Sequence, residues 1–237
     1  MRLVVTRPQP DGERTAAALR ARGHDVLLAP LMRVEPLPVE ISGGWGAIIL
    51  TSANAANAIA RNAAREALCK LPVFAVGRRT AEAAREAGFV NVSSADGDVR
   101  DLVRLITEHR PDASAPMLYL AGEDRAADLV SELAMRGVAA EMAVVYRVVA
   151  TPFPPALKTA LANGQVDAVL HFSRRSAENF VAGATRAGVA AEAFKVRHVC
   201  LSEQVAAPLA AAGAVRITVA PRPDEAALID TLDQTQA

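Results

Sequence analysis

Arginine and small hydroxyl side chains gather in the turns that follow short apolar runs of this 237-residue chain. The turn residues concerned are Thr6, Arg7, Thr51, Ser52, Asn54, Gly77, Arg78, Thr80, Gly122, Arg125, Ser173, Arg174, Ser176 and Ser202. Where such a turn opens a helix, free backbone N–H groups and the positive end of the helix dipole favour an anion. Arginine adds paired hydrogen bonds to carboxylate or phosphate. As a set these residues predict anion recognition, although each one alone is also explained as a helix cap or a solvated charge.

One tyrosine interrupts an internal repeat. Residues 31–38, LMRVEPLP, have a near-copy within residues 144–154, VVYRVVATPFP, with matched positions 114 residues apart. Tyr146 stands where the first copy has Met32. A phenol is protonated at neutral pH and can donate a proton or a hydrogen bond. Tyr146 is therefore a candidate proton donor, and the alternative is a ring that only packs against its neighbours.

Signatures of several other chemistries are absent from the sequence. It has no GxxxxGK[ST], GxGxxG, GxSxG or HExxH motif, which argues against nucleotide, serine-hydrolase and zinc-protease sites. Basic and acidic residues balance at 26 each, so no overall field favours nucleic acid or an anionic membrane. Cys69 and Cys200 lack metal-ligand spacing and are expected to be buried, reduced thiols. His171 and His198 fall in expected strands and are expected to be structural. We expect no cofactor and no metal.

Short apolar runs alternate with helical stretches along the whole chain, and they do so twice. The expected strands are residues 3–6, 26–29, 47–50, 73–76, 90–92, 117–120, 142–145, 167–170, 198–201 and 215–219, and the expected helices are residues 12–22, 55–67, 81–87, 99–108, 126–136, 176–187, 205–212 and 225–232. Alternation of this kind predicts parallel sheets with helices on both faces. The second half repeats the order of the first, which predicts an α/β protein formed by internal duplication.

These expected elements decide where a ligand can bind. In open parallel sheets, ligands collect beyond the carboxyl ends of the strands, at helix starts. The candidate turns all occupy such places and are expected to share a sheet edge. The proline-rich residues 30–38 and 151–155 are the expected hinges. No apolar run is long enough for a membrane span or a leader peptide, so we expect a soluble, cytoplasmic protein.

Six motifs taken together resemble the uroporphyrinogen-III synthase family over nearly the whole chain. They are VVTRP at residues 4–8, TSAN at 51–54, VGRRTA at 76–81, VYR at 145–147 before Pro152, FSRRSAENF at 172–180 and PRPDEAAL at 221–228. The order and spacing of the motifs carry the resemblance. It implies two α/β domains joined by a two-stranded linker, with residues 1–34 and 151–237 in domain one and 38–146 in domain two.

The resemblance also implies a reaction. The family closes hydroxymethylbilane, a linear tetrapyrrole with eight carboxylates, to uroporphyrinogen III, inverting ring D and releasing water. This is a step of heme biosynthesis and mainly a task of positioning, which needs no catalytic dyad. Tyr146 is implied as the group that helps the hydroxyl to leave, with Thr80 as a second catalytic residue on the opposing domain. A monomer is expected, without nucleic-acid or membrane partners.

Two turns depart from the family's pattern. Residues 121–125 and 202–204 are more acidic than their family counterparts. Negative charge there would repel an anionic substrate, which argues against direct contact. A second interpretation is a two-lobed cytosolic protein that binds or senses an anionic ligand without catalysis. A nucleotide-sugar or phosphate-binding enzyme is a weaker third, because the Gly-rich loop is absent. Tyr146 and the Thr80 turn separate the first interpretation from the second, since a binding protein needs no proton donor.

Overall fold

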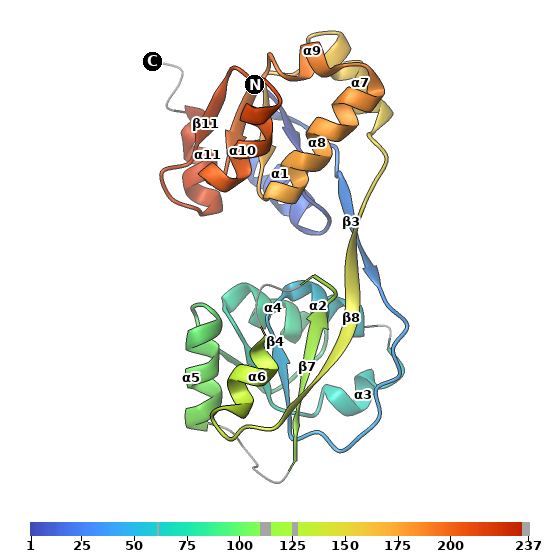
Figure 1. Cartoon of the computed structure of the whole chain (residues 1–237), viewed down its shortest axis with the longest axis vertical. Helices are drawn as coiled ribbons and strands as arrows, with labels where there is room; N and C mark the ends of the chain where they lie inside the picture. The colour runs from blue at the N-terminus through green and yellow to red at the C-terminus, as the bar shows by residue number, and fades with distance from the viewer. Residues whose placement is uncertain (61, 110–114, 125–127, 234–237) are drawn as a thin grey trace. The chain divides into compact units, whose positions relative to one another are not determined.

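The chain forms two compact units. The computed structural model describes residues 1–60, 62–109, 115–124 and 128–233. The first unit consists of Met1–Arg33 with Val149–Ala237, and the second of Val34–Val148. Each unit is a sheet covered by helices on both faces (Figure 1).

The first unit has a five-stranded sheet in the order β11-β10-β9-β1-β2, and all four strand pairs are parallel. Its strands are β1 (Arg2–Val5), β2 (Asp25–Leu28), β9 (Ala168–His171), β10 (Arg197–Cys200) and β11 (Ile217–Val219). Its helices are α1 (Asp11–Ala21), α7 (Pro155–Ala162), α8 (Arg174–Ala187), α9 (Ala190–Ala193), α10 (Glu203–Ala211) and α11 (Glu225–Asp233).

Helices bury both faces of this sheet. Because successive side chains of a strand point to opposite faces, neighbouring residues of β1 belong to different apolar clusters. Val4 packs into one apolar cluster, which includes Phe180 of α8. Its neighbours Leu3 and Val5 pack into the other cluster, which includes Leu228 of α11. This explains why the strands are apolar throughout, as expected for parallel strands between two helix layers.

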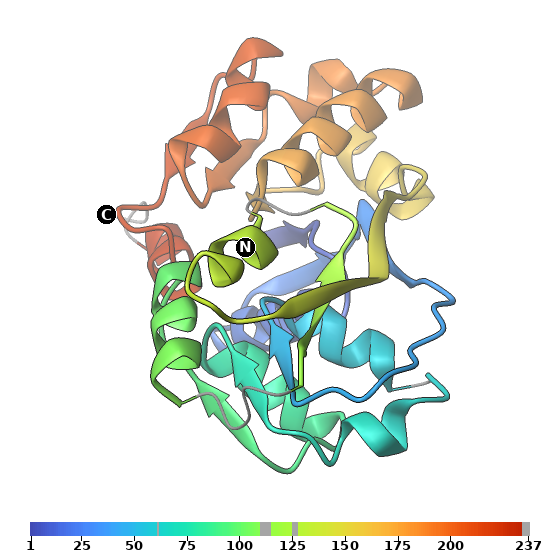
Figure 2. The same cartoon turned by 60° about the horizontal axis from the view of Figure 1, so that its bottom comes forward.

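The second unit has a six-stranded sheet in the order β3-β8-β7-β4-β5-β6. Its strands are β3 (Met32–Pro36), β4 (Ala47–Leu50), β5 (Val73–Ala75), β6 (Val92–Ser94), β7 (Met117–Gly122) and β8 (Ala140–Ala150). Its helices are α2 (Ala53–Ile59), α3 (Arg65–Leu68), α4 (Arg78–Glu86), α5 (Val99–His109) and α6 (Leu129–Ala134). Helices α5 and α6 pack against one face, where Figure 2 shows them in green and yellow-green, and α2, α3 and α4 pack against the other.

The strand order confirms the predicted duplication. Strands β6, β5, β4, β7 and β8 follow one another in the second sheet as β11, β10, β9, β1 and β2 do in the first. These are the strands that the sequence repeat pairs with one another. The predicted α/β class is likewise confirmed, and the two sheets are mostly parallel.

Some boundaries differ from the expectation. Residues 55–67 were expected to form one helix, but α2 ends at Ile59 and α3 begins at Arg65. Between them the side-chain oxygen of Asn62 accepts a hydrogen bond from Ala64 N at 2.9 Å, a local bond that competes with helix continuation. Helices α7 and α9 were not expected. The expected helix 126–136 is α6, and residues 126 and 127 lie outside the described residues.

Strands β3 and β8 are neighbours, and the boundary between the units falls within both. Leu37 N donates to Val145 O at 2.9 Å, and Thr151 N donates to Leu31 O at 3.0 Å. Between these two bonds the residue number increases in β8 as it decreases in β3, which is the pattern of an antiparallel pair. The domain limits and the two-stranded linker stay predictions. Among the described residues, no helix is long and apolar enough to cross a membrane.

Candidate active site

Three candidate turns of the second unit and Tyr146 of β8 lie along one edge of its sheet. The strands β8, β7, β4 and β5 are adjacent and parallel, so their carboxyl ends share this edge. Tyr146 lies in β8 opposite Gly122, the last residue of β7. Thr51 follows β4, and Gly77 lies just beyond β5. The fold therefore brings together residues that are far apart in the sequence.

Tyr146 depends on the glycine beside it. A Cβ atom at Gly122 would lie 2.6 Å from Cζ and 2.8 Å from Oη of Tyr146, so only glycine leaves room for the phenol ring. The ring is 8% exposed. Its hydroxyl forms no hydrogen bond within residues 1–60, 62–109, 115–124 and 128–232. The phenol proton is therefore available to a ligand.

A second tyrosine supports the turn after β4. The hydroxyl of Tyr119 lies 2.9 Å from Oγ1 of Thr51, and Tyr119 is 4% exposed. Tyr119 was not among the predicted site residues because it lies inside an apolar strand. The one available signal was its hydroxyl group, which must find a hydrogen-bond partner among otherwise apolar neighbours. In the same turn Ser52 caps α2, accepting a hydrogen bond from Asn54 N at 3.2 Å.

The start of α4 is not capped by a side chain. Its N-cap is Gly77, in an extended conformation with φ −160° and ψ 171°. The first N–H groups of the helix therefore lack a side-chain acceptor and can meet an anion. Arg78 is 81% exposed and pairs with Asp96 at 3.3 Å.

Thr80 lies in the first turn of α4 and is 6% exposed. Its hydroxyl forms no hydrogen bond with the residues that the structure describes. Thr80 and Tyr146 belong to the same unit, so the expectation that Thr80 lies on the opposing domain is wrong. The predicted bounds of domain two, residues 38–146, already contain both residues.

In the first unit, two candidate hydroxyls bind each other. Oγ1 of Thr6 lies 2.9 Å from Oγ of Ser176 and donates to Leu170 O at 3.0 Å. Thr6 is 0% exposed and Ser176 is 1% exposed. The pair joins the end of β1 to the first turn of α8 and the end of β9. In this structure neither hydroxyl is accessible to a ligand.

Arg7 is held among carboxylates. Its guanidinium pairs with Glu225 at 3.0 Å and with Asp11 at 3.3 Å, and its Cζ lies 4.4 Å from the centre of the Phe172 ring. Burial lowers the pKa of Arg7, and Glu225 counteracts that shift. These contacts tie the turn after β1 to the start of α11.

The remaining candidates of the first unit begin α8 and α10. Ser173 caps α8, accepting from Ser176 N at 3.2 Å, and the exposed Arg174 pairs with Glu178 at 2.9 Å. Ser202 is the N-cap of α10, but its side chain forms no capping hydrogen bond. Arg125, predicted to bind substrate, lies outside the described residues.

The two thiols differ in environment. Both are free; Cys200 is buried, as expected, whereas Cys69 is only half-buried. Burial, with a contribution from Glu203, raises the pKa of Cys200 to about 12, so this thiol stays protonated and unreactive. No cluster of metal-ligating side chains occurs among the described residues.

Fold and site together define a duplicated α/β protein. In each unit, helix starts with hydroxyl and arginine side chains line the carboxyl edge of a parallel sheet. A family model described as "Uroporphyrinogen-III synthase HemD" matches residues 13–230. The chain belongs to the uroporphyrinogen-III synthase family.

Solved structures agree with this fold. The uroporphyrinogen-III synthetase of Helicobacter pylori 26695 is 17% identical with a TM-score of 0.67, and the match covers 100% of both chains. A mutant uroporphyrinogen III synthase of Thermus thermophilus is 19% identical with a TM-score of 0.53, covering 99% of this chain and 98% of that one. Comparison with curated proteins gave no match.

Family membership fixes the activity. The chain is a lyase of heme biosynthesis that closes hydroxymethylbilane to uroporphyrinogen III with loss of water and inversion of ring D. The alternative of an anion-binding sensor without catalysis is not favoured.

Proposed function

We propose that Tyr146 donates the proton with which the substrate's hydroxyl leaves as water. The observation that carries this proposal is the phenol hydroxyl, a possible donor that forms no hydrogen bond with any described residue. The carbon–oxygen bond breaks, and the departing oxygen takes the phenol proton. The resulting cationic carbon then bonds to ring D; for ring D to be inverted, its existing bond to the preceding ring must break and re-form on the other side of ring D, and the proton that ring D finally loses can return to the phenolate. Proton donation of this kind is typically worth about 10²–10⁴ in rate.

Backbone N–H groups hold the substrate's carboxylates in this proposal. The helices α4 and α10 correspond to each other in the duplication, and both begin without a side-chain cap. Gly77 and Ser202 are their N-caps. In contrast, α2 and α8 already have serine caps. We assign the first carboxylate contacts to the starts of α4 and α10, where the N–H groups are not already occupied.

Side chains around those helix starts have secondary roles. Thr51, Asn54, Arg78, Gly122 and Thr80 belong to the second unit's share of the substrate site. In the first unit, Ser173 and Arg174 contribute to substrate binding at the start of α8. Arg125 is proposed as a binding residue because of the family resemblance alone.

Three predicted binding residues receive supporting roles instead. Thr6 and Ser176 are buried and bonded to each other, and Arg7 is bound by Asp11 and Glu225. We propose that they fix the shapes of the turns that follow β1 and β9, while exposed neighbours contact the substrate.

The proposal also includes the organisation of the protein. Residues 1–34 with 151–237, and residues 38–146, act as two domains joined by the pair β3 and β8. The enzyme works as a cytoplasmic monomer without cofactor, nucleic acid or membrane partner. The units found in the structure and the family's small-molecule substrate support these assignments.

Isomer analysis tests the catalytic proposal. The purified chain is incubated with freshly generated hydroxymethylbilane, and the oxidised product is separated into isomers. Wild-type protein should give the III isomer, while substrate without enzyme cyclises unaided to the other isomer. Wild-type turnover by Tyr146→Phe would remove the proton-donor role and leave the family's activity standing.

A further inference from the structure

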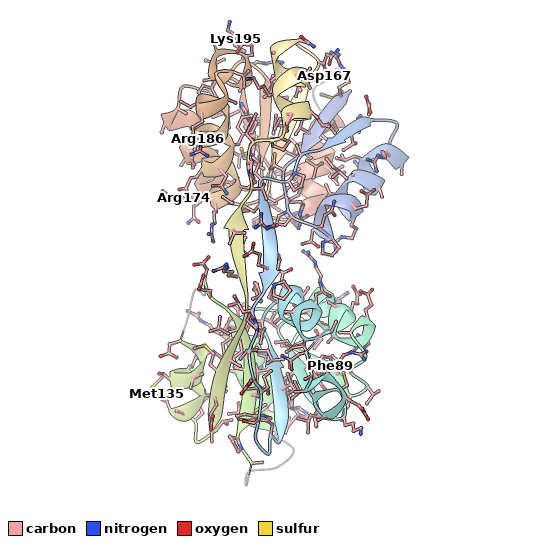
Figure 3. All side chains as sticks on the ribbon, turned by 90° about the vertical axis from the view of Figure 1, so that its right-hand side faces the viewer. Phe89, Met135, Asp167, Arg174, Arg186 and Lys195 are labelled. Atoms are coloured by element: carbon pink, nitrogen blue, oxygen red, sulfur yellow. The ribbon has the colours of Figure 1, made fainter. Side chains whose placement is uncertain are left out.

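A cavity of about 500 Å³ opens at the end of the first unit's sheet that is opposite its candidate turns. It is lined at the amino ends of the strands by Asp167, just before β9, by Arg197, the first residue of β10, and by Arg216, just before β11. Figure 3 labels Asp167 and Lys195 at one end of this unit and Arg174 toward the other. The cavity is therefore separate from the unit's share of the active site, and its volume lies in the range of small-molecule sites.

The floor of the cavity is apolar. Leu161 of α7, Val166, Val196 and Leu232 of α11 contribute to the lining. Leu161 and Leu232 are almost fully buried, so their side chains are fixed by the core behind them. A surface of this kind favours an aliphatic or aromatic group over water.

A buried arginine forms one wall. Arg197 is 6% exposed, and its guanidinium donates to Thr231 O at 2.9 Å and to Thr218 Oγ1 at 3.4 Å. Both acceptors are neutral, and Nη1 has no hydrogen bond within the described residues. Burial lowers the pKa of Arg197, and repulsion by Arg216 lowers it further. A buried cation that faces another cation is costly unless an anion accompanies it.

The other charged groups of the lining do not supply that anion. Lys195 and Arg216 add two exposed cations. Asp167 is already bound by Arg2, whose backbone N donates at 2.6 Å and whose guanidinium lies at 3.6 Å. Glu192 is exposed and forms no salt bridge with the described residues. The cavity lining therefore holds three cations and only one carboxylate, that of Glu192, without a salt bridge to a described residue.

We propose that this cavity is a second binding site, separate from the active site, for a small amphipathic anion. Its carboxylate or phosphate group pairs with Arg197 and Arg216, and its apolar body fills the space between Leu161 and Leu232. Arginine suits either acidic group because its N–H donors match two oxygens at once.

Calorimetric titration of the full chain with decanoate, decyl phosphate, decanol and inorganic phosphate tests the site. We expect the two amphipathic anions to bind more tightly than decanol or phosphate, and the better of the two identifies the acidic group. Arg216→Glu should weaken that binding at least about tenfold by replacing attraction with repulsion. The matched control is Arg186→Glu, an exposed arginine of α8 outside the cavity. Turnover of hydroxymethylbilane should stay unchanged in both variants.

Several results would overturn the proposal. Equal binding of decanol and decanoate would show an apolar cavity without anion recognition. Equal loss of binding in Arg186→Glu would show a nonspecific charge effect. Absence of binding by both amphipathic anions would reject the site outright, whatever the turnover. Because Arg216 is exposed, its replacement tests the site without the risk to folding that a change at the buried Arg197 carries.

Discussion

Nε2 of His171 lies 3.1 Å from Nδ1 of His198, and both rings are 0% exposed. Nε2 of His198 lies 3.1 Å from Ala193 O, a contact that requires a proton on that nitrogen. Nδ1 of His198 is then the acceptor for His171. Nδ1 of His171 is left as a buried acceptor without a partner in the described part of the chain. The ring of Phe180 lies edge-on to both imidazoles, so the neutral pair is part of the core.

This pair predicts loss of stability in acid. Burial lowers the pKa of His198 from 6.5 to about 4, against a smaller opposing effect of Ala193 O. Burial and the neighbouring His198 lower the pKa of His171 well below 6.5. Between the lowered folded-state pKa values and 6.5, the unfolded chain binds more protons than the folded chain. The contribution of the pair to the free energy of unfolding is therefore fully present above pH 6.5 and is lost as the pH falls below it. His198 alone should cost about 2 kcal/mol between pH 7 and pH 5. Urea unfolding at the two pH values measures this.

The control for that experiment replaces both imidazoles. A variant with His171→Leu and His198→Leu keeps an apolar core of similar volume and removes both titrating groups. Its unfolding free energy should change less between pH 7 and pH 5 than that of the wild type. An equal change in both proteins would assign the acid sensitivity to other residues.

Tyr146→Phe should lower turnover about 100-fold, the low end of the range for general acids, because the substrate loses its hydroxyl readily. The fold and the preference for the III isomer should persist, since isomer choice depends on how the substrate is held. Turnover and isomer ratio are measured together. Thr80→Ala is the companion variant and should have a smaller effect. A change of isomer in Tyr146→Phe would give the tyrosine a positioning role instead.

Gly122→Ala should disturb Tyr146 without touching its chemistry. The added methyl group would lie 2.6 Å from Cζ of the ring, so the phenol must move. We expect a loss of stability of about 1–3 kcal/mol and a fall in kcat. In the Tyr146→Phe background the same change should lower kcat little further. Gly44→Ala is the matched control, because a Cβ there meets nothing within 4 Å.

Gly77→Asp should stabilise the protein and weaken substrate binding. The extended backbone at Gly77 accepts any residue, and the nearest atom to an added Cβ is 3.9 Å away. An aspartate cap would occupy the N–H groups of α4 and repel a carboxylate, raising KM about tenfold; its stabilising effect is a few tenths of a kcal/mol. Gly77→Asn caps the helix without a charge and separates the two effects. Unchanged KM in both variants would exclude the start of α4 from carboxylate binding.

Arg7→Ala should mainly lower stability, whereas Arg174→Ala should mainly weaken substrate binding. Arg7 is 12% exposed and joins Asp11 to Glu225, so its loss should lower the free energy of unfolding by about 2 kcal/mol. Arg174 is 67% exposed, and its loss should weaken substrate binding by less than about 1 kcal/mol. Thermal unfolding and KM are measured for both variants. Abolished turnover in a folded Arg174→Ala would contradict a substrate held by many weak contacts.

The sequence by itself determined the fold class, the duplication and the candidate turns. Each of these depends on local patterns. Apolar runs such as residues 47–50 are strands because both sides are buried, and helix starts after them attract anions whatever the details of packing. The repeat then predicts that both halves share one strand order, because two copies of one pattern fold in the same way. Tyr146 became a candidate because the repeat shows a tyrosine where the other copy has a methionine.

Only the tertiary structure decided which of the polar groups remain available. Thr6 and Ser176 are 170 residues apart and bind each other, and Arg7 meets Glu225 across 218 residues. Tyr119 reaches Thr51, and His171 reaches His198, through the same kind of distant packing. A side chain's residue type gives its donors and acceptors, but its neighbours determine whether they are already bound. Those neighbours are set by how strands and helices pack, which no local pattern contains.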